Sequence, residues 1–117
     1  MKNQPFYKRF TFAFAGIRTA FRTEKSFRTQ CVFALAALLM LMVLRPNPIW
    51  WGLLSLTIGC VLAAELINTS LEALIDHVHP QLHPMIAKAK DCAAGAVLVM
   101  SVTSLLVAAA LLVDLFY

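Results

Sequence analysis

Charged residues are scarce in this chain. Only 14% of its 117 residues are charged, whereas 61% are hydrophobic, and the mean hydropathy is +0.77. A soluble domain of this size could not cover so much apolar surface with so few charges. The composition therefore excludes an ordinary soluble globular protein. It predicts a small integral membrane protein made of one domain.

Motifs built on cysteine or glycine are also missing. Cys31, Cys60 and Cys92 are isolated and form no CxxC pair, so we interpret them as packing residues. The sequence contains neither a P-loop nor the glycine-rich loop of soluble kinases. Any nucleotide site in this protein is therefore expected to be of an unusual kind.

Three apolar stretches are candidates for membrane crossing. The first has a core of only fourteen residues, from Cys31 to Leu44. Because a crossing helix needs roughly 20 apolar residues, we expect this one to begin near Ser26. Its basic lead is too long for a cleaved signal peptide, and no small-residue cleavage site follows Leu44. The predicted membrane helices span about 26–46, 48–78 and 84–115.

Basic residues are distributed unevenly along the chain. Seven of the ten precede residue 29, and Lys88 and Lys90 lie between the second and third apolar stretches. Only Arg45 lies in the first loop. Since Lys and Arg favour the cytoplasmic side of a membrane, the N-terminus and the second loop are predicted to be cytoplasmic. With three crossings, the C-terminus is then outside.

The N-terminal segment, residues 1–25, is amphipathic and does not resemble a membrane span. Its apolar residues recur at helical spacing and form one stripe: Phe6, Phe10, Phe14, Ile17 and Phe21. Basic residues occupy much of the remaining surface. A helix of this kind lies in the membrane interface and is attracted to anionic lipid. It is either a simple anchor or one wall of a site that opens to the lipid.

A polar stripe interrupts the second apolar stretch. Glu65, Asn68, Glu72 and Asp76 fall within an arc of about 80° on a helix. A charge at mid-bilayer costs about 2.5–3.5 kcal/mol, so even shallower glutamates need compensation. The stripe can hold helices together. It can also carry chemistry, because carboxylates beside a cytoplasmic cavity bind hard cations such as Mg²⁺ or move protons. We favour the second interpretation.

Lys90 and Asp91 stand where the third apolar stretch enters the membrane. A lysine can bind phosphate, and a helix N-terminus attracts anions. A solvated ion pair is the alternative. Beside a carboxylate stripe, the combination predicts a site for phosphate and a divalent metal. Zinc is not expected, because two prolines interrupt the helix that would align His79 with His83.

Three motifs strongly resemble the prokaryotic diacylglycerol kinase family of small membrane lipid kinases. They are "TEKSFR", "ELINTSLEALID" and "AKDCAAGAVL", and the resemblance covers nearly the whole chain. It implies an all-α membrane protein with an amphipathic interfacial helix and three transmembrane helices, which assembles as a homotrimer with sites between subunits. It also implies transfer of the ATP γ-phosphate to a membrane lipid alcohol at the bacterial inner membrane. No nucleic-acid partner is expected.

The same resemblance implies roles for individual residues. Glu65 corresponds to the catalytic base, with Asn68 supporting it. Glu24 and Glu72 correspond to ligands of the Mg²⁺ bound to ATP, and thereby contact ATP.

Further residues are candidate contacts to the two substrates. The ATP candidates are Lys90, near phosphate, together with Asp91 and His83. The lipid candidates are Arg28, Glu65 and Ala94, although anchoring at the interface explains Arg28 equally well.

The lipid substrate is left open between two branches of the family. Lys90 and Asp91 are followed here by "CAAGAV". Undecaprenol kinases of Gram-positive bacteria read "AAGAV" at this point, whereas enterobacterial diacylglycerol kinases read "GSAAV". The segment "FAFAGIRTAFRTEKSFR" also looks more like the undecaprenol branch. The sequence therefore favours undecaprenol over diacylglycerol, although both branches share the same machinery.

Two hypotheses from other classes of function remain open. One is a non-catalytic membrane subunit that uses the Glu65/Asn68/Glu72 stripe to oligomerise. The other is a proton- or cation-conducting oligomer in which the stripe lines a pore. The Lys90–Asp91 pair and the basic amphipathic segment fit a nucleotide-and-lipid site better than either.

Overall fold

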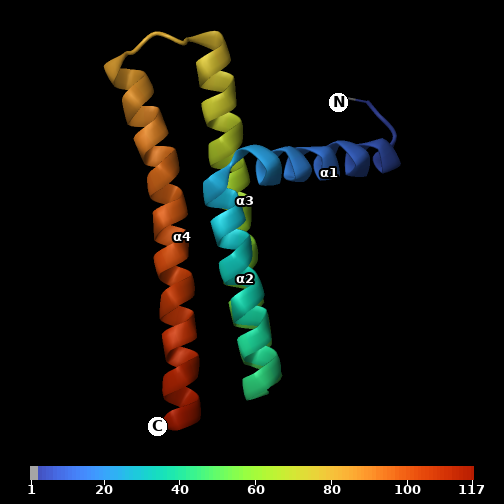
Figure 1. Ribbon diagram of the computed structural model, residues 1–117, viewed down its shortest axis with the longest axis vertical. Helices are drawn as coiled ribbons and strands as arrows, with labels where there is room; N and C mark the ends of the chain where they lie inside the picture. Colours follow the sequence, from blue (N-terminus) through green and yellow to red (C-terminus); the bar gives the residue numbers. More distant parts are fainter. Residues whose placement is uncertain (1–2) are drawn as a thin grey trace.

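The computed structural model describes residues 3–117, which form four α-helices (Figure 1). They are α1 (Phe6–Thr23), α2 (Lys25–Leu44), α3 (Pro48–Val78) and α4 (Pro84–Phe116). Helices α2, α3 and α4 are long and apolar enough to cross a membrane. The prediction of an all-α membrane protein with three spanning helices is confirmed.

Prolines begin two of the long helices, and a residue in the left-handed backbone conformation ends the third. Pro48 and Pro84 occupy the first positions of α3 and α4, where the missing N–H costs no helical hydrogen bond. Helix α2 ends before Arg45, which has φ 48° and ψ 55° and donates its N–H to the Leu41 carbonyl at 3.0 Å. Few residues other than glycine adopt this conformation. The chain reverses there, and α3 returns alongside α2 (Figure 1).

A sharp corner separates α1 from α2. Glu24 is extended, with φ −110° and ψ 107°, and its N–H donates to the Ala20 carbonyl at 2.8 Å. The Arg28 guanidinium donates from Nη1 to the carbonyls of Phe21 and Arg22 at 2.8 and 3.0 Å. These bonds satisfy carbonyls at the end of α1 that lack helical partners. Helix α1 consequently lies across the long helices (Figure 1).

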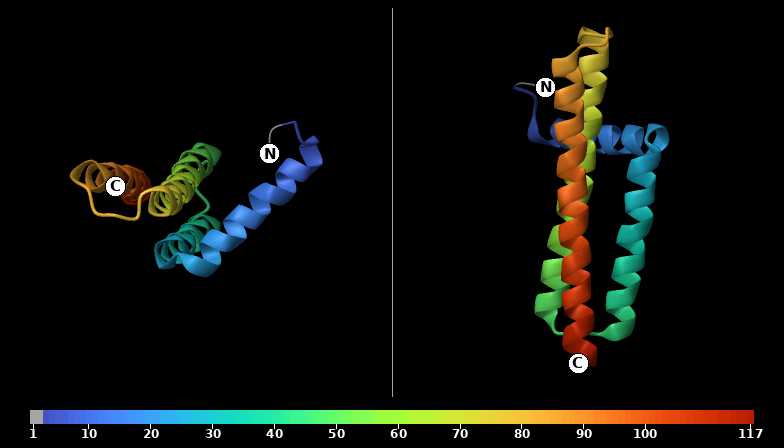
Figure 2. Two further views of the ribbon diagram at one scale, coloured as in Figure 1. Left: turned by 90° about the horizontal axis from the view of Figure 1, so that it is seen from above. Right: turned by 90° about the vertical axis from the view of Figure 1, so that its left-hand side faces the viewer.

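Helix α3 is the centre of the packing. It contacts α4 along much of its length and α2 on another side, and α1 meets α2 and α3 (Figure 2). Leu41, Leu54 and Leu111 form the best-buried cluster, one from each long helix. Among the described residues, only six hydrophobic side chains are buried. Most large apolar side chains therefore face outward, as expected for helices surrounded by lipid or by other subunits.

The long helices are staggered relative to α1. Helices α3 and α4 continue past the level of α1 for several turns before the loop that joins them, whereas α2 begins at the level of α1 and runs in the opposite direction (Figure 1). The part of α3 that carries the polar stripe thus begins beside the α1–α2 corner and then extends beyond it.

Candidate active site

Glu65 is the most enclosed charged side chain of the polar stripe. It lies on α3 with only 3% of its surface exposed. Ser26, in the first turn of α2, donates from Oγ toward both carboxylate oxygens, at 2.9 Å to Oε1 and 3.0 Å to Oε2. The hydroxyl has one proton, so it donates to one oxygen at a time. A contact between α2 and α3 therefore holds this carboxylate at the level of the corner.

Ser26 is a further candidate site residue, which the sequence motifs did not indicate. The residue lies two positions after Glu24 within "TEKSFR". A hydroxyl at the start of a membrane helix, so close to a motif glutamate, was a usable signal. Its partner on α3 could not be identified without the fold.

Asn68 and Glu72 interact one helical turn farther along α3. Asn68 Nδ2 donates to Glu72 Oε1 at 3.4 Å, which is a long hydrogen bond. Asn68 Oδ1 is buried and has no hydrogen-bond partner among the described residues. Because buried acceptors are nearly always satisfied in proteins, this oxygen is placed to receive a donor or a cation from outside the chain.

The donor set fits Mg²⁺ in its chemistry. Glu24 at the corner and Glu72 are half-buried carboxylates, and the unpartnered Asn68 oxygen lies beside Glu72. Hard cations prefer such oxygen ligands. Within residues 3–117, no group of three His, Cys, Asp or Glu side chains is arranged to hold a metal. Mg²⁺ takes one or two protein carboxylates and completes its shell with water and substrate phosphates.

Lys90 forms an ion pair with Asp76 on α3 and not with the adjacent Asp91. Its Nζ donates to Asp76 Oδ1 at 2.6 Å and so joins α4 to the end of the stripe on α3. The Lys90 and Asp76 side chains are 36% and 62% exposed, and Asp91 is also exposed. The structure thus brings the ammonium group to the stripe across the helix pair.

His83 has a structural contact at the start of α4. Its Nδ1 accepts a hydrogen bond from the Met85 N–H at 3.1 Å. In a neutral imidazole the proton is then on Nε2, which remains free to donate. The ring lies edge-on to His79, with centroids 6.1 Å apart. Both histidines, with Asp76 and Lys90, line a hollow of about 410 Å³ at this end of the molecule.

The lipid candidates occupy separate places. Arg28 is engaged with the carbonyls at the end of α1, so it stabilises the corner. Ala94 is exposed on α4. The neighbouring Gly95 would have open space around an added Cβ, so it does not mark a close helix contact within this chain.

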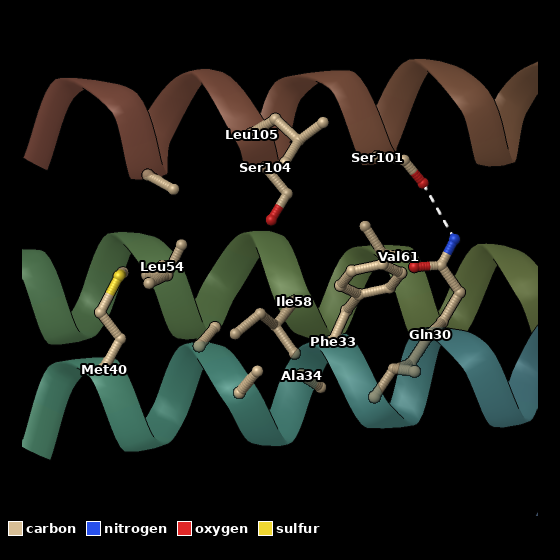
Figure 3. A pocket seen from close by; sticks show the side chains of 14 residues that line it. Gln30, Phe33, Ala34, Met40, Leu54, Ile58, Val61, Ser101, Ser104 and Leu105 are labelled. Atoms are coloured by element: carbon tan, nitrogen blue, oxygen red, sulfur yellow. Dashed lines mark hydrogen bonds between the residues drawn. The ribbon is translucent and has the colours of Figure 1, made fainter. Parts of the chain in front are cut away.

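A second hollow lies deeper between α2, α3 and α4. It has a volume of about 390 Å³ and is mostly apolar, with Phe33 and Ile58 in its lining (Figure 3). At one end, Gln30 Nε2 donates to Ser101 Oγ at 3.2 Å and links α2 to α4. Val61, one turn before Glu65 on α3, also lines it. None of the site residues predicted from the sequence does, so this hollow is distinct from the carboxylate stripe.

Comparisons with known proteins agree with one another. A family model described as prokaryotic diacylglycerol kinase matches residues 11–112. The undecaprenol kinase of Bacillus subtilis (strain 168) is 36% identical over 102 residues, covering 87% of this chain and 83% of that protein. The diacylglycerol kinase of Synechocystis sp. is 38% identical over 104 residues, covering 88% of this chain and 59% of that protein. The diacylglycerol kinase of Escherichia coli (strain K12) is 28% identical over 95 residues. The chain therefore belongs to the prokaryotic diacylglycerol kinase family of membrane lipid kinases.

Proposed function

We propose that this protein transfers the γ-phosphate of ATP to the hydroxyl of a membrane lipid at the cytoplasmic face of the bacterial inner membrane. One observation carries the proposal. The Glu65 carboxylate is 3% exposed and is hydrogen-bonded at the level where α1 meets the long helices. A carboxylate enclosed in a membrane protein needs a functional or structural reason. In a lipid kinase, the functional reason is the hydroxyl of the lipid headgroup, from which a carboxylate at this depth can remove a proton.

Glu65 acts as the general base. A base must come within hydrogen-bond reach of the proton that it removes, and Ser26 occupies only one carboxylate oxygen at a time. The other oxygen accepts the proton of the lipid hydroxyl as that hydroxyl attacks the γ-phosphorus, and the bond from this phosphorus to the bridging oxygen breaks to release ADP. The unpartnered Asn68 oxygen supports the reacting groups by accepting a hydrogen bond.

Glu24 and Glu72 hold Mg²⁺ with its ATP. The ion, when bound, neutralises phosphate charge, which is the main requirement of phosphoryl transfer. Glu72 lies seven residues after Glu65 on α3, about 10 Å farther along the helix axis. This separation directs the nucleotide toward the cytoplasm and the lipid toward the membrane.

Lys90, Asp91 and His83 bind the nucleotide. Lys90 already forms an ion pair with Asp76, but exposed pairs of this kind contribute only about 0–1 kcal/mol. Exchanging the aspartate for a phosphate oxygen therefore has a small cost. The free Nε2–H of His83 is a second donor on the same hollow.

Helix α1 lies in the membrane interface as an amphipathic helix. Phe6, Phe10 and Phe14 are more than half exposed, with values of 71%, 53% and 66%. Such rings are favoured among lipid headgroups and acyl chains, and the basic residues of α1 bind anionic lipid. The N-terminus and the active site are then cytoplasmic, and the C-terminus lies outside.

The protein assembles as a homotrimer with active sites between subunits. The outward-facing apolar residues of α2, α3 and α4 are available for helix packing as well as for lipid. Native mass spectrometry in detergent is expected to give three copies of the chain.

The lipid is undecaprenol in preference to diacylglycerol. The support comes from "CAAGAV" after Asp91 and from the N-terminal motif. The comparisons do not separate the two lipids, because relatives of both kinds match at 36% and 38% identity.

A direct kinase assay tests the proposal. Purified protein is incubated with γ-labelled ATP and Mg²⁺ and with either undecaprenol or diacylglycerol, and the Glu65→Gln variant is run in parallel. Label is expected in a lipid, more in undecaprenol, and far less with the variant. Label in neither lipid would contradict the kinase function and favour a structural or an ion-conducting oligomer. A proton-flux assay in vesicles would then distinguish the two, because only the ion-conducting oligomer gives a flux.

A further inference from the structure

Ser26 contacts the carboxylate of Glu65, the proposed base. Among residues 3–117, its hydroxyl is the only side-chain group that donates a hydrogen bond to the Glu65 carboxylate. The two distances, 2.9 and 3.0 Å, are nearly equal, so the hydroxyl lies between the two oxygens. Glu65 is 3% exposed, so the carboxylate itself has little contact with water, whereas Ser26 is exposed. The orientation of the carboxylate therefore depends on one side chain.

The backbone around Ser26 is itself well fixed. The residue stands in the first turn of α2, directly after the corner at Glu24. Arg28, two residues later, ties this turn to the last carbonyls of α1. Phe27, between them, is 3% exposed and anchors the same turn. A serine on so constrained a turn can hold its partner in one orientation, as a positioning residue must.

We propose that Ser26 is a positioning residue for phosphoryl transfer. Its hydroxyl donates to one oxygen of Glu65 and turns the other toward the lipid hydroxyl. The inference rests on the proposed function, and specifically on the base role of Glu65. Because Ser26 is two residues from Glu24, the same turn of α2 also sets the distance between the base and the proposed metal ligand.

A purely structural role is the competing explanation. A serine–carboxylate bond across two membrane helices can simply hold α2 against α3. That role predicts weaker assembly and poorer binding of both substrates when the hydroxyl is lost. A positioning role predicts a loss confined to turnover, since binding groups elsewhere are untouched.

The first experiment separates kcat from KM. Ser26→Ala is expected to lower kcat about 10- to 100-fold, the effect of losing one hydrogen bond to a charged group. The KM values for ATP and lipid are expected to stay within about twofold. Ser26→Thr, which keeps the hydroxyl, should retain most of the rate. Thr29→Val is the matched control, because the Thr29 hydroxyl donates to Lys25 O within α2 and not to Glu65.

The second experiment is a double-mutant cycle with Glu65→Gln. If Ser26 acts through Glu65, Ser26→Ala should lower the residual rate of Glu65→Gln no further. Independent, additive losses would overturn the proposal, as would normal kcat in Ser26→Ala. Near-normal turnover in Glu65→Gln would instead overturn the base role on which the inference rests. If Ser26→Ala does not assemble, Ser26→Cys takes its place in both experiments, because a thiol is a weak donor of similar shape.

Discussion

Each carboxylate of the polar stripe has a different environment along α3. Glu65 is enclosed and bonded to a hydroxyl, Glu72 is half-buried beside an amide, and Asp76 is 62% exposed and paired with Lys90. Desolvation thus decreases steadily from the corner toward the loop. This gradient fits a deep base, a metal ligand at intermediate depth and a solvated ion pair at the end.

Glu65→Gln is predicted to lower kcat by about 10²–10⁴-fold, the usual contribution of a general base. The amide is nearly isosteric and can still accept a hydrogen bond from Ser26, so assembly should be preserved. Steady-state kinetics and size-exclusion chromatography measure the two properties. A variant that assembles and turns over at a near-normal rate would remove Glu65 from the base role.

Lys90→Gln is predicted to raise the KM for ATP and to leave the KM for lipid unchanged. The reason is the loss of a charged donor to phosphate. Asp76→Asn is the matched control, because it breaks the same 2.6 Å ion pair but keeps the ammonium group. It should not raise the KM for ATP. Equal effects of the two substitutions would mean that only the ion pair matters.

The corner between α1 and α2 explains how the helix that precedes α2 is connected to the proposed site. Glu24 interrupts the helical hydrogen bonding, and its carbonyl accepts from the Arg28 N–H at 3.2 Å as α2 begins. A continuous helix through this region would carry Ser26 away from α3. The bend instead brings Ser26, at the start of α2, within hydrogen-bond distance of Glu65 on α3.

Glu24→Gln and Glu72→Gln are both predicted to raise the Mg²⁺ concentration needed for half-maximal activity, in addition to lowering the rate. The reason is that a metal loses affinity when a charged oxygen ligand becomes neutral. Asp114→Asn, which removes a carboxylate at the far end of α4, should leave the requirement unchanged. Mg²⁺ titration at fixed ATP is the measurement. Unchanged half-saturation in both site variants would contradict a metal shared between the corner and α3.

Replacing Phe10 and Phe14 with Ser is predicted to raise the KM for a long-chain lipid while the KM for ATP stays nearly constant. Burying a phenylalanine among acyl chains is worth roughly 1.5–3 kcal/mol, so the double change weakens the contact of α1 with lipid. Phe12, also on α1 but off this stripe, is the control position. A rise in both KM values would show that α1 supports the whole fold. No change in either would make it only an anchor.

The whole molecule is a set of apolar helices with few internal contacts. Its buried core is limited to six hydrophobic side chains among the described residues. In membranes, close packing, interhelical hydrogen bonds and lipid replace the hydrophobic core of soluble domains. The pairs Gln30–Ser101 and Thr57–Ser104, at 3.2 and 3.3 Å, are bonds of this kind between the long helices.

The membrane topology is testable with single cysteines in a variant lacking Cys31, Cys60 and Cys92. A cysteine at Tyr117 is predicted to react with a membrane-impermeant maleimide added to intact cells. A cysteine at Leu82, in the loop between α3 and α4, should react only after permeabilisation, because the positive-inside bias places this loop in the cytoplasm. The reverse labelling pattern would invert the proposed orientation.

Hydropathy and periodicity determined much of the fold from the sequence alone. They are properties of neighbouring residues, so the three spanning helices and the shared face of Glu65, Asn68 and Glu72 could be predicted without tertiary structure. The motif resemblance identified the family for the same reason, because its residues are contiguous in short segments.

Only the tertiary structure decided which side chains meet. Ser26 and Glu65 are 39 positions apart, and Gln30 and Ser101 are 71 apart, so their hydrogen bonds depend on how the helices pack. Lys90 shows the same limit, since it pairs with Asp76 across two helices and not with the adjacent Asp91. Adjacent residues on a helix point about 100° apart, whereas helices that pack side by side bring distant residues within hydrogen-bond reach.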